Sequence, residues 1–180
     1  MIELASGRMF DTADCYITIE EMAASLSKQC RFTGSCRHFY SVAEHSIIVS
    51  LLMEDMGLGD PVEGLLHDGI ETAVGDLASP WKPVIGWRGF EHPMDAKLRA
   101  HYDLTPAKTK GCDYADQLAG YIEARLLMPS RGELWSDADM KLEADRLIAD
   151  GWRTLNLYPP EAEAAFLKRW EALNGKDRIH

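Results

Sequence analysis

The feature that most constrains the fold of this chain is the recurrence of apolar residues at helical spacing. One such stripe contains Val62, Leu65, Leu66 and Ile70, and similar segments of helical length recur along the chain. Runs of four to eight alternating residues rich in Val, Ile and Thr, which would predict strands, are scarce. The sequence therefore predicts an all-α fold, a compact helical bundle.

Capping residues mark several of the expected helix starts. Thr18 with Glu21 and Ser41 with Glu44 both fit a capping box, in which a hydroxyl and a carboxylate satisfy free backbone donors. A third start is predicted at Asp60, where Pro61 takes the first helical position. The predicted helices span 18–29, 42–56, 61–75, 93–101, 106–127, 137–155 and 161–173.

Two further features complete the expected layout. Residues 75–89 hold several prolines, glycines and tryptophans and predict a long ordered loop beside a site that needs covering. Gly111 is expected to break or bend the helix over 106–127, because an interior glycine costs about 1 kcal/mol relative to alanine.

Length and charge limit the classes of function. The chain has 180 residues and no linker, which predicts a single domain over 1–180. Its 29 acidic and 19 basic residues give a net charge of −10, so we expect no duplex nucleic acid partner. No stretch approaches the roughly 18 apolar residues that cross a bilayer, and the first residues lack the layout of a signal peptide. We therefore expect no membrane partner and a cytoplasmic location.

The most informative string is GLLHDGIE, residues 64–71, at the polar edge of an otherwise apolar helix. Helical spacing places His67, Asp68 and Glu71 on neighbouring faces of one turn. Imidazole and carboxylate ligands together suit a divalent ion, and a further carboxylate one turn on can act on metal-bound water. The alternative is a core histidine bonded to a backbone carbonyl, with solvated carboxylates.

A second string, YSVAEHS at residues 40–46, places His45 in the first turns of the preceding helix. A short glycine-containing connection makes the two helices antiparallel neighbours, so His45 can complete a cluster with His67 and Asp68. The alternative is a buried imidazole satisfied by other protein groups.

Taken in order, five strings resemble those of the HD-domain metal-dependent phosphohydrolases. They are RFTG (31–34), YSVAEHS (40–46), LLHDGIE (65–71), GD (75–76) and PWK (80–82). The resemblance is greatest to small enzymes related to bacterial 5′-deoxynucleotidases and to phage dATP triphosphohydrolases of the DatZ type, and it is strongest over 29–128. It implies an HD-type helical bundle, a homo-oligomer, and the host cytoplasm if the chain is phage-encoded.

The resemblance also implies the ligands of one divalent ion, which would be cobalt, zinc, manganese or magnesium. These are His45, His67, Asp68 and an aspartate on a later helix, with Glu71 as the catalytic proton carrier. Asp113 and Asp116 compete for the last position, since they lie three apart on one helix face. We favour Asp116, because ADQLA (115–119), followed by Glu123, is similar to the family's later helix.

For substrate binding the resemblance points to residues around the first and last strings. These are Arg31, Phe32, Thr33, Asp76 and Lys82. Arginine suits bidentate phosphate contacts, and Phe32 and Trp81 can stack on a base. Asp76 would either hold a sugar hydroxyl or cap a turn. The chain departs from the family at Ser35, where the pattern often has histidine, and His38 follows later.

Two reactions on a deoxynucleotide substrate fit these residues. We favour a deoxynucleoside triphosphate triphosphohydrolase that prefers dATP and releases deoxyadenosine and triphosphate. The alternative is a 5′-deoxynucleotidase that converts deoxynucleoside monophosphates to nucleoside and phosphate. A nucleotide-binding module without turnover and a cyclic-nucleotide hydrolase are further alternatives, and the retained Glu71 argues against the first of these.

Overall fold

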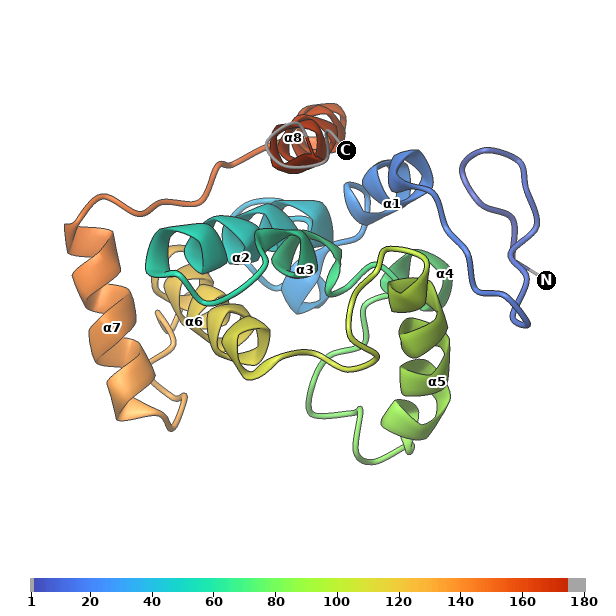
Figure 1. Ribbon diagram of the computed structural model, residues 1–180. Coiled ribbons are helices and arrows are strands. Elements are labelled where there is room, and N and C mark those ends of the chain that lie inside the picture. Colours follow the sequence, from blue (N-terminus) through green and yellow to red (C-terminus); the bar gives the residue numbers. More distant parts are fainter. Residues whose placement is uncertain (1, 175–180) are drawn as a thin grey trace.

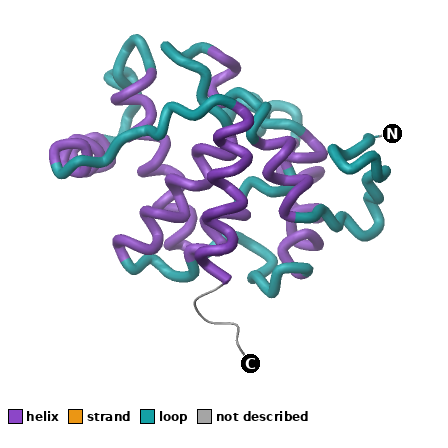
Figure 2. The backbone as a smooth tube through the Cα atoms, turned by 90° about the horizontal axis from the view of Figure 1, so that it is seen from above, coloured by secondary structure: helices purple, strands orange, loops and turns teal. Residues whose placement is uncertain are grey.

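The computed structural model describes residues 2–174, and these residues are helical and compact (Figures 1 and 2). The elements are α1 (Ile19–Leu26), η1 (Arg31–Gly34), α2 (Val42–Met56), α3 (Pro61–Leu66), α4 (Glu71–Val74), α5 (Trp87–Ala100), α6 (Lys110–Leu127), α7 (Ala138–Ala149) and α8 (Pro159–Asn174). Between residues 2 and 174 the only β pairings are two isolated bridges. The predicted all-α class is confirmed.

Helix α2 lies at the centre of the molecule and is buried on two sides. Toward α1, α3 and α8 it contributes Val42, Ala43 and Ile47 to one apolar cluster. Toward α6 and α7 it contributes Ile48, Val49, Leu52 and Met53 to a second cluster. A helix with apolar residues around most of its circumference has to be central. α2 therefore joins two groups of helices into one body.

The capping box at Thr18 is confirmed, whereas the one at Ser41 is half wrong. The Ser41 hydroxyl accepts the Glu44 N–H as expected, at 3.1 Å. The Glu44 carboxylate, however, accepts backbone N–H groups of Leu155, Asn156 and Leu157 at 2.6, 2.8 and 3.1 Å. This carboxylate thus fastens the segment between α7 and α8 onto the start of α2.

The continuous helix predicted over 61–75 is wrong, because the structure divides it into α3, a turn at residues 67–70, and α4. Gly69 explains the tight turn. A Cβ at this position would lie 3.0 Å from the Leu66 carbonyl oxygen and 3.1 Å from Met22 Sδ. The turn therefore packs closely on α1, and it leaves His67 and Asp68 outside regular helix.

Other boundaries also differ from expectation. α5 begins at Trp87, so Pro93 lies inside it and the loop expected over 75–89 is shorter. α6 begins at Lys110 behind the Thr109 cap, four residues later than predicted. α7 ends at Ala149 instead of 155, and α8 begins at Pro159 instead of 161. Two of these boundaries follow local signals, since Thr109 caps the start of α6 and Gly151, with a φ of 108°, follows the end of α7.

The expectation that Gly111 breaks a helix is wrong. Gly111 lies in the first turn of α6, where a Cβ would approach the Leu58 carbonyl oxygen to 1.8 Å. The glycine thus lets the start of α6 pack directly on the backbone that follows α2.

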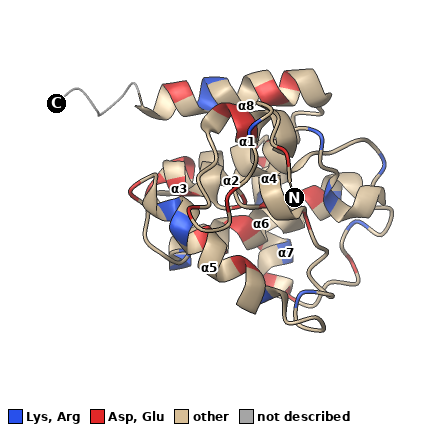
Figure 3. Cartoon of the chain, turned by 90° about the vertical axis from the view of Figure 1, so that its right-hand side faces the viewer, with Lys and Arg blue, Asp and Glu red and all other residues tan. Residues whose placement is uncertain are grey.

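Two further observations concern the described chain as a whole. None of them is long and apolar enough to cross a membrane. Acidic and basic residues are interspersed along the ribbon in the view of Figure 3.

Candidate metal centre and adjoining cavity

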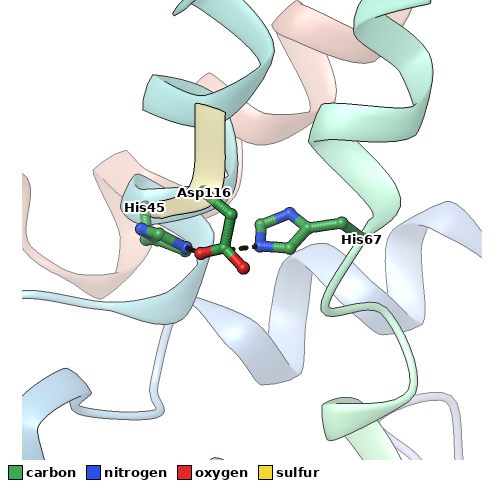
Figure 4. A group of neighbouring side chains, drawn as sticks. All are labelled: His45, His67 and Asp116. Atoms are coloured by element: carbon green, nitrogen blue, oxygen red, sulfur yellow. Dashed lines mark hydrogen bonds and ion pairs between the residues drawn. The ribbon is translucent and has the colours of Figure 1, made fainter. Parts of the chain in front are cut away.

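Three ligand-type side chains from different elements converge at one point. His45 comes from α2, His67 from the turn after α3, and Asp116 from α6, and their ligand atoms all lie within 4.8 Å of one another (Figure 4). Asp116 Oδ1 is 3.1 Å from His45 Nε2 and 3.7 Å from His67 Nε2. The structure thus brings together three of the four predicted ligands as a possible metal-binding triad.

The second ring nitrogen of each histidine is anchored. His45 Nδ1 lies 2.5 Å from Glu123 Oε1, and His67 Nδ1 lies 2.8 Å from the Gly64 carbonyl oxygen. A backbone carbonyl oxygen can only accept a hydrogen bond, and so can an ionised carboxylate. Each Nδ1 therefore carries the hydrogen of its contact. This arrangement turns both Nε2 atoms toward the cluster, as in metal-binding histidines generally.

The donor set fits a divalent ion. His67 Nε2 is buried and makes no hydrogen bond of acceptable geometry among the described residues, although the Asp68 carboxylate lies close to it. A buried nitrogen without a hydrogen bond is costly, whereas imidazole and carboxylate together are common ligands of divalent metal ions. The observation supports the metal-ligand interpretation of His67 over that of a satisfied core histidine.

Asp68 and Asp116 both flank the imidazoles. Asp68 Oδ2 lies 3.1 Å from His67 Nε2 and 3.7 Å from His45 Nε2. Asp113, the alternative to Asp116, is exposed and lines the neighbouring cavity, and among the described residues it forms no hydrogen bond or ion pair with either imidazole. The geometry therefore selects Asp116 and places Asp68 beside the triad.

The charges of this cluster are strongly coupled. Burial raises the pKa of Asp68, but His67 and Lys108 outweigh it and hold that pKa well below its usual range. Burial lowers the pKa of His67, but chiefly Asp68 raises it to about 9. The negative field that favours a proton on His67 also favours a divalent cation there, so ion and proton compete for Nε2.

Glu71 lies beside the cluster in a different environment. It is buried, one carboxylate oxygen is 3.4 Å from Lys82 Nζ, and the other has no hydrogen-bond partner among the described groups. Burial first, and then the negative charges of Asp68 and Asp76, raise the pKa of Glu71 well above its usual range. Glu71 therefore tends to keep a proton where Asp68 has lost one, which is the separation that acid–base chemistry requires.

Lys108 is a site residue that the sequence did not reveal. Its Nζ lies 3.4 Å from Asp68 Oδ1 and 3.1 Å from Asp116 Oδ2. It belongs to the irregular segment before α6, so no periodicity links it to Asp116. Only the tertiary packing of that segment brings it to the cluster.

Arg31, predicted to bind phosphate, contacts the cluster from the other side. Its Nη2 is 3.2 Å from Glu123 Oε2 and its Nη1 is 4.0 Å from Asp68 Oδ2. The Tyr40 hydroxyl also donates to Glu123, at 3.0 Å. Burial raises the pKa of Glu123, but Arg31 and His45 hold it below its ordinary value. Glu123 could have been found from its spacing, since it follows Asp116 by seven residues on one helix face.

A cavity of about 820 Å³ adjoins the cluster. His67, Asp68 and Asp116 form part of its wall, next to basic side chains. Those basic residues are Lys82, Arg88 and Lys108. The wall also contains carboxylates, namely Asp68, Glu91, Asp95, Asp113 and Asp116, and both lysines are paired with carboxylates, so charges of both signs line the cavity.

The other predicted substrate residues lie outside the lining of this cavity. Phe32 and Thr33 adopt the left-handed conformation, with φ of 55° and 52°, and the Phe32 ring lies near the Arg31 guanidinium and the Trp135 ring. Trp81 is 60% exposed. The Asp76 N–H donates to Gln29 Oε1 at 3.1 Å, and burial raises the pKa of its carboxyl group. The structure brings Arg31 beside Asp68 and Glu123 and Lys82 beside Glu71 and Glu91, and the substrate-binding roles of all five residues stay predictions.

Fold and site together define a class: a helical protein in which two buried histidines and a partly exposed aspartate form a possible site for a divalent ion. A comparison with models of known protein families gave no match. The chain is similar to the uncharacterized protein YfdR of Escherichia coli, with 31% identity over 88% of this chain and 85% of YfdR. It is also similar to an uncharacterized protein of Rhodobacter capsulatus, with 31% identity over 94% and 93% of the two chains. The chain therefore belongs to the family that includes YfdR.

Proposed function

We propose that this protein is a metal-dependent phosphohydrolase of the HD type that acts on a deoxynucleotide. The observation that carries the proposal is the convergence of two anchored imidazoles with Asp116, beside a cavity that contains basic side chains. His45, His67, Asp68 and Asp116 would hold one divalent ion. When bound, such an ion supplies a water molecule that is acidic enough to act as a nucleophile near neutral pH.

The residues of the chain would divide the remaining work. Lys82 and Lys108 face the cavity and would neutralise phosphate oxygens, with Arg31 approaching from the other side of the cluster. Phosphate carries several negative charges, so an acidic protein needs such local cations to bind it.

Glu71 would manage the protons of the reaction. Attack of water on the α-phosphorus forms one P–O bond and breaks the bond to O5′, which leaves as an alkoxide unless it receives a proton. Glu71 is buried next to Lys82, and its raised pKa favours the protonated acid that can supply this proton. It would regain a proton from the attacking water.

Among deoxynucleotides we favour a triphosphate, and dATP in particular. A triphosphate carries more charge than a monophosphate, and the cavity provides Lys82, Arg88 and Lys108 in addition to the candidate metal centre. The expected products are deoxyadenosine and inorganic triphosphate. We also propose that the protein is a homo-oligomer located in the cytoplasm.

The test is a product analysis with purified protein and Mn²⁺, Co²⁺, Zn²⁺ or Mg²⁺. Chromatography would follow incubations with dATP, dGTP, dCTP, dTTP, ATP and dAMP. Release of triphosphate from dATP, with Lys82→Ala weakening dATP turnover more than dAMP turnover, is the expected result. Release of phosphate from dAMP with dATP untouched would identify a 5′-deoxynucleotidase, and inertness toward every nucleotide would refute the proposal.

A further inference from the structure

One buried carboxylate, Glu123 on α6, holds groups on both sides of the candidate metal centre. Its Oε1 is 2.5 Å from His45 Nδ1 and 3.0 Å from the Tyr40 hydroxyl, while its Oε2 is 3.2 Å from Arg31 Nη2. Glu123 and His45 are both completely buried. No water competes for these contacts, so the carboxylate sets the geometry of its neighbours.

The contact with His45 exceeds what pairing the charge requires. A buried carboxylate needs a cation, which Arg31 supplies, and hydrogen bonds, of which Tyr40 donates one, while Oε2 has no hydrogen-bond partner among the described groups. Glu63 shows the arrangement without a ligand, since it is buried and held by Arg99 at 2.5 Å and by Thr109 at 2.6 and 2.9 Å. Glu123 differs because it also contacts the nitrogen of His45 that faces away from the cluster.

We propose that Glu123 is a positioning residue of the metal centre. By accepting the Nδ1 hydrogen of His45, it fixes the tautomer and the ring orientation that direct Nε2 toward the ion. The inference rests on the metal site of the proposed function and not on its substrate. Glu123 lies seven residues after Asp116 on α6, so one helix supplies a ligand and also holds a second ligand in place.

The expected effect is a loss of metal affinity. Removing the outer partner of a metal-binding histidine typically costs about 10- to 100-fold in affinity. Glu123→Gln keeps the size of the side chain and an acceptor oxygen but loses the charge, so it should fall near the lower end of this range. Glu123→Met has similar length and no comparable acceptor, so it should fall near the upper end.

The experiment is a titration of the metal-stripped protein with Co²⁺, followed by the visible absorption of the bound ion. Tyr40→Phe is the first control, because it removes the other donor to the same oxygen and leaves His45 in contact. Glu63→Gln is the second, because it neutralises a buried, ion-paired glutamate that touches no ligand. Both controls should bind Co²⁺ as the unaltered protein does.

A second measurement needs no variant and so does not depend on their folding. Nitrogen NMR of the metal-stripped, unaltered protein reports which ring nitrogen of His45 carries hydrogen. The inference requires hydrogen on Nδ1, and a hydrogen on Nε2 alone would overturn it.

The titration has equally definite outcomes. Wild-type affinity in Glu123→Gln and Glu123→Met, or an equal loss in Glu63→Gln, would overturn the positioning role. An unaltered protein that binds no Co²⁺ would overturn this inference and the proposed function together. An unaltered protein that binds Co²⁺ but hydrolyses no nucleotide would refute the proposed function alone.

Discussion

At the scale of single residues, the proposed function divides the side chains of the candidate centre into those that would hold an ion and one, Glu71, that would carry a proton. His67→Ala and Asp116→Asn should lose bound metal, because they remove atoms of the cluster. Asp113→Asn and His38→Ala should keep it, because neither residue belongs to that cluster. Elemental analysis of the four purified variants checks this prediction. A metal-replete Asp116→Asn protein, or greater loss in Asp113→Asn, would mean that the wrong aspartate was assigned.

Glu71 should separate binding from chemistry. Glu71→Gln keeps the shape of the side chain but cannot carry the proton that its raised pKa favours. We expect unchanged metal content and nucleotide affinity, with turnover lower by roughly 10²-fold or more, the scale of general acid–base catalysis. Calorimetric titration measures the nucleotide affinity, and a rate assay measures the turnover. Turnover at the unaltered rate would remove Glu71 from the mechanism.

Asp95 gives a prediction about stability and pH. Its Oδ1 is buried without a hydrogen-bond partner among the described groups, and burial above all raises its pKa to about 6. Between about pH 4 and 6 the folded protein therefore binds more protons here than the unfolded chain, so stability falls as pH rises through this window. Asp95→Asn cannot ionise, and it should be more stable than the unaltered protein at pH 7.5 by about 2 to 3 kcal/mol.

Urea unfolding in the presence of a chelator measures this difference. At pH 3.5, below both pKa values, the gap between Asp95→Asn and the unaltered protein should largely close. Asp113→Asn, at an exposed position on the same cavity, is the matched control. A stabilisation that is equal at both pH values would show that ionisation of Asp95 is not its cause.

The sequence was most informative about residues whose chemistry is local. His67 and Asp68 adjoin each other, and His45 lies on the helix before them, so motif order was enough to group them. Lys108 reaches Asp68 and Asp116 from an irregular segment, which no helical period could predict. The sequence pattern included Glu123 but gave it no role, because that role depends on which ring nitrogen of His45 the carboxylate contacts.

At the scale of elements, the helix starts marked by a capping pattern in the sequence were predicted correctly, whereas the starts of α5, α6 and α8 were displaced. Thr18, Ser41 and Asp60 all cap helices as expected, because a cap is a contact within one turn. The division of the helix predicted over 61–75 and the fastening of the segment before α8 depend instead on packing between elements. The turn at Gly69 packs on Met22, and Glu44 holds a segment more than one hundred residues away, and neither contact leaves a local pattern.

Two glycines in helices allow a matched test of this distinction. A Cβ at Gly111 would meet the Leu58 carbonyl at 1.8 Å, whereas a Cβ at Gly89 would meet nothing within 4 Å. Gly111→Ala should destabilise the protein by about 1 to 3 kcal/mol or more, because the backbone after α2 has to move. Gly89→Ala should stabilise it by up to about 1 kcal/mol through helix propensity. Denaturant unfolding of both variants measures the two changes in the free energy of unfolding. An unchanged free energy in Gly111→Ala would contradict the close approach of Gly111 to Leu58.

At the scale of the whole molecule, the candidate centre joins the two apolar clusters that meet on α2. The ligands come from α2, from the turn after α3 and from α6. α3 packs with α1 and α8 in one cluster, whereas α6 packs with α7 in the other. An ion held by these ligands would therefore connect both groups of helices across the central helix.

This position predicts a cooperative response of the entire chain to metal. An ion that binds the folded protein alone stabilises it by about 2.7 kcal/mol at a concentration of one hundred times its dissociation constant. For a chain of 180 residues that energy corresponds to a rise in melting temperature of roughly 5 to 10 °C. Chelation should lower the melting temperature and the ion should restore it, in Gly89→Ala as in the unaltered protein but not in Asp116→Asn.

Hydrogen exchange distinguishes cooperative from local stabilisation. If the ion links the two groups of helices, amides in α7 and in α8 should both exchange more slowly with metal, because neither group then opens without disturbing a ligand. α7 contacts no ligand directly in this arrangement; it packs on α6, which carries Asp116. Protection confined to α2, α3 and α6 would show that the centre stiffens only its own ligands, and that the two groups of helices open independently of it.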